Sequence, residues 1–357
     1  MLVALLTDTH AGARNNLDIL HTFFDKFYSD VFFPYLQENN IQKIIHLGDM
    51  FEKRSTIDFA TLHKTREYLF DKFYENDLSV DVIVGNHDCR FKSTNQVNSP
   101  NLLLQDYIKS GHVRVFSEPT EVTLDNTKIV YMPWICQDTY DKSMDMLKNS
   151  TANILLGHLE VSGFEMYRGS VHHGGTPSSL FSNFCLVCSG HFHHRSTKGN
   201  ISYLGSPYET CWSDYNDPRG FHILDTDTLE LTFIENPNRL FHKIPYDDSE
   251  HQNTEFIANM DFSNYTDCYV KVIVDKKTNP HWFELFIEKL EKSSPIDVQI
   301  IDDSLSFLMD ETEEIDDTVE DTLSILTRTV EVADVKVDKS KLSDLFISLY
   351  NEAKHME

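Results

Sequence analysis

The chain has 357 residues, of which 40% are hydrophobic and 25% charged, and its formal net charge is −26. This length supports a full core and more than one domain, and no apolar run is long enough to suggest a membrane span. The acidic balance argues against a surface that binds nucleic acid over its whole area. Residues 1–240 carry a net charge of −10 and residues 241–357 carry −16, so the last third holds most of the excess.

Strands and helices alternate through the first 90 residues. Short apolar runs predict buried strands, and apolar residues at helical spacing predict helices between them. The predicted strands are 2–7, 41–47 and 80–84, and the predicted helices are 17–36 and 59–73. A polar motif follows each strand, namely Asp8-Thr9-His10, Gly48-Asp49 and Gly85-Asn86-His87-Asp88. Because open α/β sheets place their sites at the carboxyl ends of strands, we expect these motifs to lie together.

The region from 113 to 234 is richer in predicted strands than the first 90 residues. These strands are 113–116, 128–132, 153–156, 184–188, 201–204, 220–224 and 229–234. Two more motifs occur among them, Gly157-His158 and Gly190-His191-Phe192-His193. We therefore predict an α/β fold in which two packed sheets form a sandwich flanked by helices. Because the apolar run after Met1 is short and the first motif begins at Asp8, we predict no cleaved leader and a cytoplasmic protein.

The character of the sequence changes near Pro245. Residues 269–274, 281–291 and 298–301 predict a strand, a helix and a strand, which would form a small β-α-β cap domain. Ten of the 20 residues in 302–321 are acidic, which predicts a solvated linker. The predicted domains are 1–245 (catalytic), 246–301 (cap), 302–335 (acidic linker) and 336–357 (amphipathic helix).

The predicted C-terminal helix has an apolar stripe at helical spacing. The stripe consists of Leu342, Leu345, Phe346, Leu349, Tyr350 and Ala353. Such a stripe docks either on the chain's own body or in a groove of a partner protein. The acidic linker before it favours a docking element on a tether.

The five motifs together supply the side chains that hold two divalent metals side by side. A bridging carboxylate is required, and Asp49 is the candidate. Asp8 and His10 would complete one site, Asn86 and His158 the other, and His191 and His193 would be shared between them. Mixed imidazole and carboxylate ligands suit Mn, Fe or Zn better than Mg or Ca.

His87 stands beside the predicted ligand Asn86 and is the candidate catalytic residue. A histidine in this place donates a proton to the leaving oxygen or stabilises developing charge. Asp88 would be the carboxylate that orients its ring and raises its pKa.

Each motif is followed by cations. They are Arg14, Lys53, Arg54, Arg90, Lys92, Arg168, Arg195 and Lys198. We interpret them as a basic ring around the metal site, because phosphate contacts require only local positive charge. The alternative is that they are scattered surface charges.

Over residues 1–240 these motifs resemble the calcineurin-like metallophosphoesterases. Gly-Asn-His-Asp, the stretch from Gly157 to Gly163, and Gly205-Ser206-Pro207 are similar to the SbcD-type DNA repair nucleases, above all to the nuclease subunits of T4-type phage recombination complexes. The resemblance implies that Asp8, His10, Asp49 and His193 bind one Mn²⁺ ion and that Asp49, Asn86, His158 and His191 bind the other, with Mg²⁺ as the alternative metal. It also implies that His87 is catalytic.

The resemblance further implies the activity and the partners. These are exonuclease action on double-stranded ends, endonuclease action on single strands, and assembly of a homodimer with an SbcC-type SMC-like coiled-coil ATPase in a heterotetramer. A phage-encoded member would act in the host cytoplasm. Glu52 departs from the pattern, since relatives often carry Asp or His there. The alternative functions are a phosphoesterase acting on phosphoproteins or small nucleotides, and a scaffold that has lost its metals.

Overall fold

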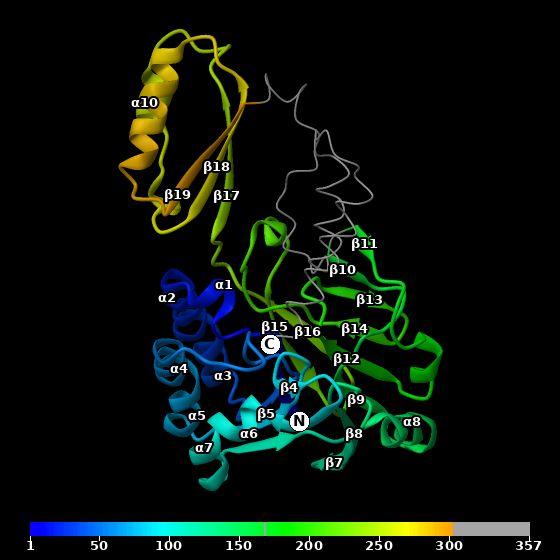
Figure 1. Cartoon of the computed structure of the whole chain (residues 1–357). Coiled ribbons are helices and arrows are strands. Elements are labelled where there is room, and N and C mark those ends of the chain that lie inside the picture. Colours follow the sequence, from blue (N-terminus) through cyan, green and yellow to red (C-terminus); the bar gives the residue numbers. More distant parts are fainter. Residues whose placement is uncertain (168, 303–357) are drawn as a thin grey trace, which may run out of the picture. The chain divides into compact units, whose positions relative to one another are not determined.

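The computed structural model describes residues 1–167 and 169–302 (Figure 1). The chain divides into two compact units. One consists of Met1–Ile244, Gln252–Val272 and Pro280–Gln299, and the other contains, among the described residues, Pro245–His251, Ile273–Asn279 and residues 300–302. Arg168, the predicted linker after Asp302 and the predicted C-terminal helix with its apolar stripe lie outside the described residues.

Two six-stranded sheets form the body, as the sequence predicts. In the first sheet the strand order is β16 (Leu231–Glu235), β15 (Gly220–Asp225), β1 (Leu2–Leu6), β2 (Lys43–His46), β3 (Ser79–Ile83) and β6 (Val113–Phe116). In the second it is β13 (Ser196–Lys198), β14 (Ile201–Tyr203), β12 (Leu186–Gly190), β9 (Ile154–His158), β8 (Thr127–Met132) and β7 (Thr120–Leu124). Strands β1, β2, β3 and β6 pair in parallel, as do β8, β9, β12 and β14, so the carboxyl ends of each set share one edge.

Alternation along the strands divides the core into three layers. Val3 and Leu5 of β1 join residues of both sheets in the inner layer, while Ala4 and Leu6 face the helices. The helices on the first sheet are α1 (Ala13–Asn16), α2 (Asp18–Phe27), α3 (Phe33–Glu38), α4 (Phe59–Thr65), α5 (Asp71–Glu75), α6 (Ser99–Leu103) and α7 (Gln105–Lys109). Helix α8 (Tyr140–Asn149) contributes Leu147 to the outer layer on the second sheet. The result is a helix–sheet–sheet–helix sandwich (Figure 1).

Both long predicted helices are interrupted by a π-helical segment. The segments are Tyr28–Phe32, between α2 and α3, and Arg66–Phe70, between α4 and α5. Tyr28 and Tyr68, one from each segment, stack with ring centroids 5.5 Å apart in the buried helical layer. The aromatic rings of the two π-helical segments thus pack against each other. The periodicity of an α-helix does not predict the wider π-helical turns that carry them.

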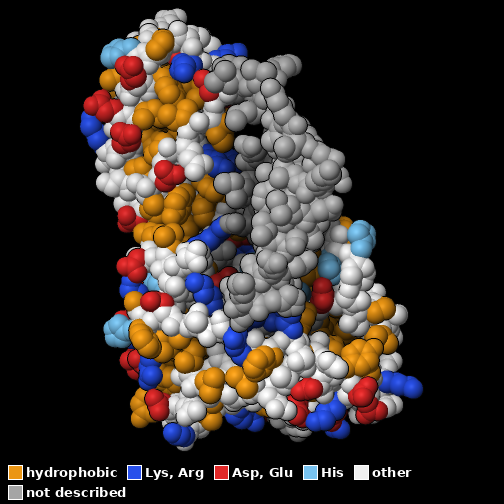
Figure 2. All heavy atoms as spheres, viewed as in Figure 1, with side chains coloured by type: hydrophobic (Ala, Val, Ile, Leu, Met, Phe, Trp, Pro, Cys, Tyr) orange, Lys and Arg blue, Asp and Glu red, His pale blue; other side chains and the backbone are white. Residues whose placement is uncertain are grey.

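Several short strands were not predicted from the sequence. Two hairpins form from β4 (Cys89–Phe91) with β5 (Thr94–Asn98) and from β10 (Glu165–Tyr167) with β11 (Ser170–Val171). A third sheet has the order β17 (Phe241–Asp247), β18 (Tyr269–Lys276) and β19 (Asp297–Asp302), with helices α9 (Glu255–Asn259) and α10 (Pro280–Glu291) in the same stretch of chain. Of these elements β18, α10 and β19 match the predicted strand, helix and strand, whereas β17 and α9 were not predicted. Ile296, Ile300 and Ile301 are exposed there, and Figure 2 shows hydrophobic side chains gathered on this part of the surface. Within the described ranges, every helix is too short or too polar to cross a bilayer.

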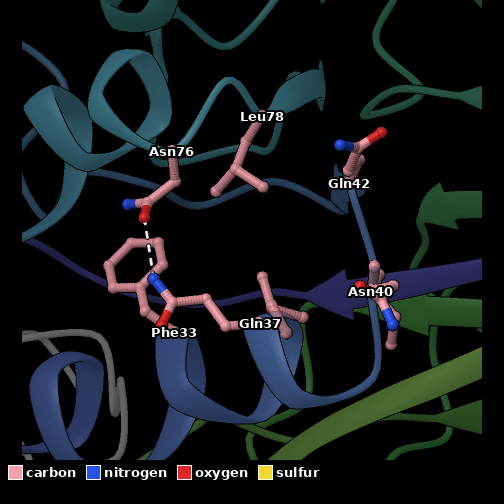
Figure 3. A pocket seen from close by; sticks show the side chains of 8 residues that line it. Phe33, Gln37, Asn40, Gln42, Asn76 and Leu78 are labelled. Atoms are coloured by element: carbon pink, nitrogen blue, oxygen red, sulfur yellow. Dashed lines mark hydrogen bonds between the residues drawn. The ribbon is translucent and has the colours of Figure 1, made fainter.

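A pocket of about 190 Å³ lies at the amino ends of β2 and β3 (Figure 3). Its lining includes Gln37 and Asn76, joined by a hydrogen bond from Nε2 to Oδ1 of 2.9 Å, with Phe33 and Leu78 beside them. Because the motifs follow the carboxyl ends of these strands, the pocket lies at the opposite edge of the sheet. Its lining holds amides and apolar groups but no ionisable side chain, so we assign it no part in the chemistry.

His222 of β15 is buried on the inner face of the first sheet and makes the fold sensitive to acid. Burial, and then the charge of Arg195, lower the pKa of His222 to about 3, from 6.5. Below pH 6.5 His222 is therefore protonated in the unfolded chain but stays neutral in the folded chain. The free energy of unfolding decreases as pH falls from 6.5 towards 3. Between pH 7 and pH 4.5 this group should cost about 2 to 3 kcal/mol.

Replacing His222 by glutamine should remove this part of the acid sensitivity. Urea unfolding of wild type and variant at pH 7 and pH 4.5 gives the free energy of unfolding of each protein. The difference in this free energy between the two proteins should change by about 2 to 3 kcal/mol between the two pH values. If wild type and variant lose stability in parallel, the charge state of His222 is not responsible.

Candidate metal centre

Five strand ends bring the predicted ligands to one edge of the sandwich. Asp8 follows β1, Asp49 follows β2, and Asn86 follows β3, which are neighbours in the first sheet. His158 ends β9 and His191 follows β12, which are neighbours in the second. Hydrogen bonds from Asp8 N to Gly48 O (3.0 Å) and from His10 N to Asp49 O (3.1 Å) continue the β1–β2 pairing into the loops. Parallel pairing thus delivers motifs that are far apart in the sequence to one place.

The ligand atoms form two clusters that meet at Asp49. One consists of Asp8, His10 and His193, and the other of Asp49, His158 and His191; the ligand atoms within each lie within 4.8 Å of one another. A third group, formed by His10, Glu52 and His87, has equally close atoms and shares His10 with the first. Asp49 Oδ2 is 3.2 Å from His158 Nε2 and 3.9 Å from His10 Nε2, so it faces both clusters.

The contacts within each cluster are close. In the first, His10 Nε2 and His193 Nε2 lie 2.9 Å apart, and Asp8 Oδ1 is 3.9 Å from His10 Nε2. In the second, Asn86 Oδ1 lies 2.8 Å from His158 Nε2. All seven predicted ligands are thus brought together in two adjacent groups.

Four of the predicted ligands lie on strained backbone. Asp8, His10, Asp49 and His191 all have positive φ, from 40° to 88°, a region that costs non-glycine residues about 1–3 kcal/mol. Such strain persists only where surrounding contacts enforce it, and it often marks a functional site. Gly85 and Gly190 permit the close approach, because a Cβ at Gly85 would lie 2.2 Å from Asp49 Oδ1 and one at Gly190 would lie 2.0 Å from Thr7 Oγ1.

Asp88 does not orient His87, contrary to the sequence prediction. Its carboxylate is fully buried and accepts four backbone N–H bonds, with Oδ2 bound by Asp49 and Gly85 and Oδ1 by Met50 and Phe51, at 2.9 to 3.3 Å. Burial, and then the charge of Asp49, raise its pKa to about 6. Asp88 therefore shapes the loop that presents Asp49, because the free N–H groups of that loop require an acceptor.

Replacing Asp88 by asparagine should destabilise the protein. The side-chain NH₂ group of asparagine would point at one pair of the backbone N–H donors that the carboxylate now accepts. These buried donors would lose their acceptor, at a cost of about 1–3 kcal/mol of stability each. Denaturant unfolding at pH 7.5 measures the loss. The control is Asp141→Asn, an exposed residue in the first turn of α8. Equal stability of the two variants would show that these N–H groups do not depend on the carboxylate.

The partner of His87 is instead Glu52. His87 Nδ1 lies 2.7 Å from the Glu52 carbonyl oxygen, and the half-buried His87 ring stands edge-on to His10, with centroids 5.0 Å apart. The backbone N–H of His87 also donates to Asp49 Oδ1 at 2.7 Å. His87 is thus fixed beside the two clusters without being a member of either.

The buried carboxylates of this centre face histidines. Within residues 1–167 and 169–302, the bases at ion-pair distance from Asp8 and Asp49 are His10 and His158. Burial alone would lower the pKa of His158, but Asp49 outweighs burial and raises it to about 9. The pKa of His10 is likewise raised to about 9 against burial, by Glu52 first and then by the two aspartates. In the metal-free chain, protons on imidazoles therefore supply the positive charge that the carboxylates require.

This donor set fits divalent metal ions. Asp8, Asp49, Asn86 and His158 are at least nine-tenths buried, and their free oxygen or nitrogen atoms converge where positive charge is favoured. A mixture of imidazole nitrogen, carboxylate and amide oxygen suits first-row transition metals. The residues present thus match a two-metal centre in type, number and placement.

Several supporting residues were not predicted from the sequence. The Thr7 hydroxyl donates to Asp8 Oδ2 at 2.7 Å, and the buried Arg219 donates to the carbonyl of His193 while its guanidinium pairs with Asp214 at 2.6 Å. Trp134 packs its ring 5.1 Å from that of His191. Only Thr7 had a signal in the sequence, its place beside Asp8; the others lie far from their partners along the chain.

The cations predicted to ring the centre lie mostly at the surface. Lys53, Arg90 and Lys92 are exposed, as are Arg14, Arg195 and Lys198, and Arg54 is half-buried. Arg195 stacks over the Phe233 ring at 4.2 Å, and Lys198 donates to the carbonyl of Gly163. Figure 2 shows Lys and Arg side chains interspersed with Asp and Glu on the face it presents. The ring remains a prediction.

Similar proteins point to the same chemistry. Exonuclease subunit 1 of Enterobacteria phage T4 is 33% identical over 283 residues, which cover 79% of each chain. The SbcD subunit of nuclease SbcCD from Staphylococcus epidermidis is 24% identical over 268 residues, covering 66% of this chain and 69% of that protein. The DNA double-strand break repair protein Mre11 of Methanocaldococcus jannaschii is 25% identical over 261 residues, covering 66% of each chain.

The family model of the calcineurin-like phosphoesterases matches residues 1–195, which contain all seven predicted ligands and His87. Members of this family use divalent metals, in agreement with the donor set described above. This chain therefore belongs to the calcineurin-like phosphoesterase family.

Proposed function

We propose that this chain is a Mn²⁺-dependent DNA nuclease that cleaves double-stranded ends as an exonuclease and single strands as an endonuclease. The observation that carries the proposal is the convergence of the seven predicted ligands on two adjacent groups, with Asp49 Oδ2 facing both and His87 fixed beside them. Family membership makes the chain a metal-dependent phosphoesterase, and the nuclease names of its relatives direct the proposal to DNA.

The two metals would be held by adjoining sets of side chains. Asp8, His10 and His193 would hold one, Asn86, His158 and His191 the other, and Asp49 both. When bound, the metals supply Lewis-acid stabilisation of the phosphodiester and lower the pKa of the attacking water. Nitrogen-rich ligation favours Mn²⁺ over Mg²⁺, which remains the alternative metal.

His87 would handle the proton of the leaving group. Its Nδ1 faces the Glu52 carbonyl, which only accepts hydrogen bonds, so Nδ1 carries a hydrogen. The other nitrogen, Nε2, is then the atom that gives a proton to the departing 3′ or 5′ oxygen when the ring is charged. Because His87 is not among the seven proposed ligands, this role does not compete with metal binding.

DNA would meet the centre through local positive charge on an acidic protein. The cations behind the motifs would contact phosphates near the metals, while the acidic remainder would discourage binding elsewhere. Their exposure at the surface supports this proposal. Residues 246–301 would form a small β-α-β cap domain.

The partner would be an SMC-like coiled-coil ATPase, with two nuclease chains in a heterotetramer. The phage T4 and S. epidermidis relatives are both named as subunits, which supports an assembly. In this proposal, the tethered segment 336–357 would bind the partner.

Cleavage assays distinguish this function from its alternative. The chain, loaded with Mn²⁺, is given a linear duplex, a circular single strand, a phosphopeptide and a cyclic nucleotide. We expect hydrolysis of both DNA substrates, stopped by a chelator and restored by Mn²⁺. Hydrolysis of the phosphopeptide or cyclic nucleotide with intact DNA would overturn the proposal in favour of a phosphatase or nucleotide phosphodiesterase.

A further inference from the structure

Glu52 follows the predicted bridging ligand Asp49 by three residues, and the structure gives it two contacts. Its carboxylate Oε2 lies 2.7 Å from His10 Nδ1, and its carbonyl oxygen lies 2.7 Å from His87 Nδ1. A predicted metal ligand and the predicted proton donor are thus held by one residue, through its side chain and through its main chain.

The loop that carries Glu52 is itself fixed. Phe51 pairs with Ala11 in a parallel bridge, and Glu52 N donates to the carbonyl of Ala11 at 3.1 Å. The Glu52 side chain is 34% exposed, whereas that of His10 is 5% exposed. The carboxylate therefore reaches inwards from the rim of the centre to the buried ring of His10.

The contact with His10 determines which imidazole nitrogen is available to a metal. The Glu52 carboxylate lies at ion-pair distance from Nδ1, off the line of a ring N–H bond. Its negative charge still favours a hydrogen on Nδ1, which leaves the lone pair on Nε2. Nε2 is the atom that faces the other ligands, 2.9 Å from His193 Nε2 and 3.9 Å from Asp49 Oδ2. Because the two nitrogens point to different sides of the ring, Glu52 lies on the side of His10 away from the cluster.

The contact with His87 has the same effect through a different group. A carbonyl oxygen only accepts, so His87 Nδ1 must donate and Nε2 is directed away from Glu52. The edge-on packing of His10 and His87, with an interplanar angle of 83°, keeps the two rings in fixed relation. Any shift of the 52 loop would thus move both rings together.

We infer that Glu52 is a positioning residue that fixes the tautomers of His10 and His87 and so couples the metal ligand to the proton donor. The inference rests on the proposed function for the role of His87, but its effect on His10 concerns metal binding alone. Carboxylates that hold a ligating histidine typically change metal affinity or activity about 10–100-fold when removed.

The length of the Glu52 side chain matters as well as its charge. Aspartate at this position would be shorter by one methylene and would not span the distance that the glutamate bridges at 2.7 Å. Glutamine has the same length and keeps an acceptor oxygen, so Glu52→Gln should preserve much of the function. Glu52→Ala should lose it.

Titration with Mn²⁺ in a calorimeter tests the contact with His10 without any substrate. In Glu52→Ala we expect two ions still to bind, with the affinity of one reduced about 10–100-fold; Glu52→Gln should lie near wild type. The matched control is Glu38→Gln, an exposed acid at the end of α3. Loss of one ion from the stoichiometry would make Glu52 a ligand and overturn the inference, as would unchanged affinity in Glu52→Ala.

Nitrogen chemical shifts test the tautomers directly. In the diamagnetic Zn²⁺-loaded protein, a two-bond proton–nitrogen correlation spectrum should show His10 and neutral His87 with the hydrogen on Nδ1. An Nε2–H tautomer of either ring would contradict the assignment. These readouts do not involve DNA, so they separate failure of this inference from failure of the nuclease proposal.

Steady-state kinetics distinguish a positioning role of Glu52 from a merely structural one. On a phosphodiester cleaved by wild type, Glu52→Ala at saturating Mn²⁺ should lower kcat and leave KM unchanged, because the metal ligand His10 loses its positioning carboxylate. The main-chain contact with His87 is kept in this variant. Glu52→Gln should restore most of kcat. A change confined to KM would overturn the inference by placing Glu52 in substrate binding.

Discussion

Asp49→Asn should abolish metal-dependent phosphodiester hydrolysis, with turnover falling by about 10³-fold or more because several kcal/mol of metal stabilisation is lost. Asp49 is 1% exposed, and its Oδ2 faces His10 Nε2 and His158 Nε2 at 3.9 and 3.2 Å. Asparagine keeps the shape but offers a neutral amide where a carboxylate faces both clusters. We therefore expect fewer than two ions to be retained.

Metal content and turnover, measured on the same preparation, check this result. Elemental analysis after gel filtration should give two ions per chain for wild type and for the surface control Asp141→Asn, and one or none for Asp49→Asn. A variant that keeps two ions and wild-type turnover would remove Asp49 from the bridging position.

His87→Gln should lower turnover on DNA by about 10²- to 10⁴-fold, the range for a lost general acid, and should leave metal content unchanged. The reason is geometric, since His87 is held by Glu52 O and is not one of the seven predicted ligands. Single-turnover cleavage of a labelled duplex measures the chemical step. If metal content falls in parallel with activity, His87 is a ligand and the proton-transfer role is wrong.

A second substrate makes this test more specific. The leaving group of bis(p-nitrophenyl) phosphate departs as a stable anion and needs no proton. His87→Gln should therefore lose much less activity on it than on DNA. Equal losses on the two substrates would mean that His87 serves the metals or the attacking water rather than the leaving oxygen.

The parts of the fold that depend on local patterns were predictable. Apolar runs located the central strands, and polar motifs at their ends located the ligands, because parallel pairing brings consecutive strand ends together. Helical spacing of apolar residues predicted the helical stretch 17–36 but not the π-helical segment Tyr28–Phe32 within it. In that segment Tyr28 packs against the ring of Tyr68, which lies 40 residues further along the chain. A local sequence pattern does not reveal such a contact.

The roles of neighbouring residues were harder to predict than the ligands. Asp88 adjoins His87 in the sequence, so a pairing between them was the natural hypothesis. In the structure its carboxylate turns instead to the N–H groups of residues 49–51 and 85, and His87 turns to Glu52. Adjacent residues on a tight loop point in different directions. The reach of Glu52 to His10 likewise depends on the pairing of two loops, which the sequence does not show.

Anomalous diffraction from crystals soaked in Mn²⁺ would locate the metals themselves. We expect two peaks about 3.5–4 Å apart, one beside Asp8, His10 and His193 and the other beside Asn86, His158 and His191, with the Asp49 carboxylate between them. A single peak, or a pair of peaks that Asp49 does not touch, would contradict the two-metal centre.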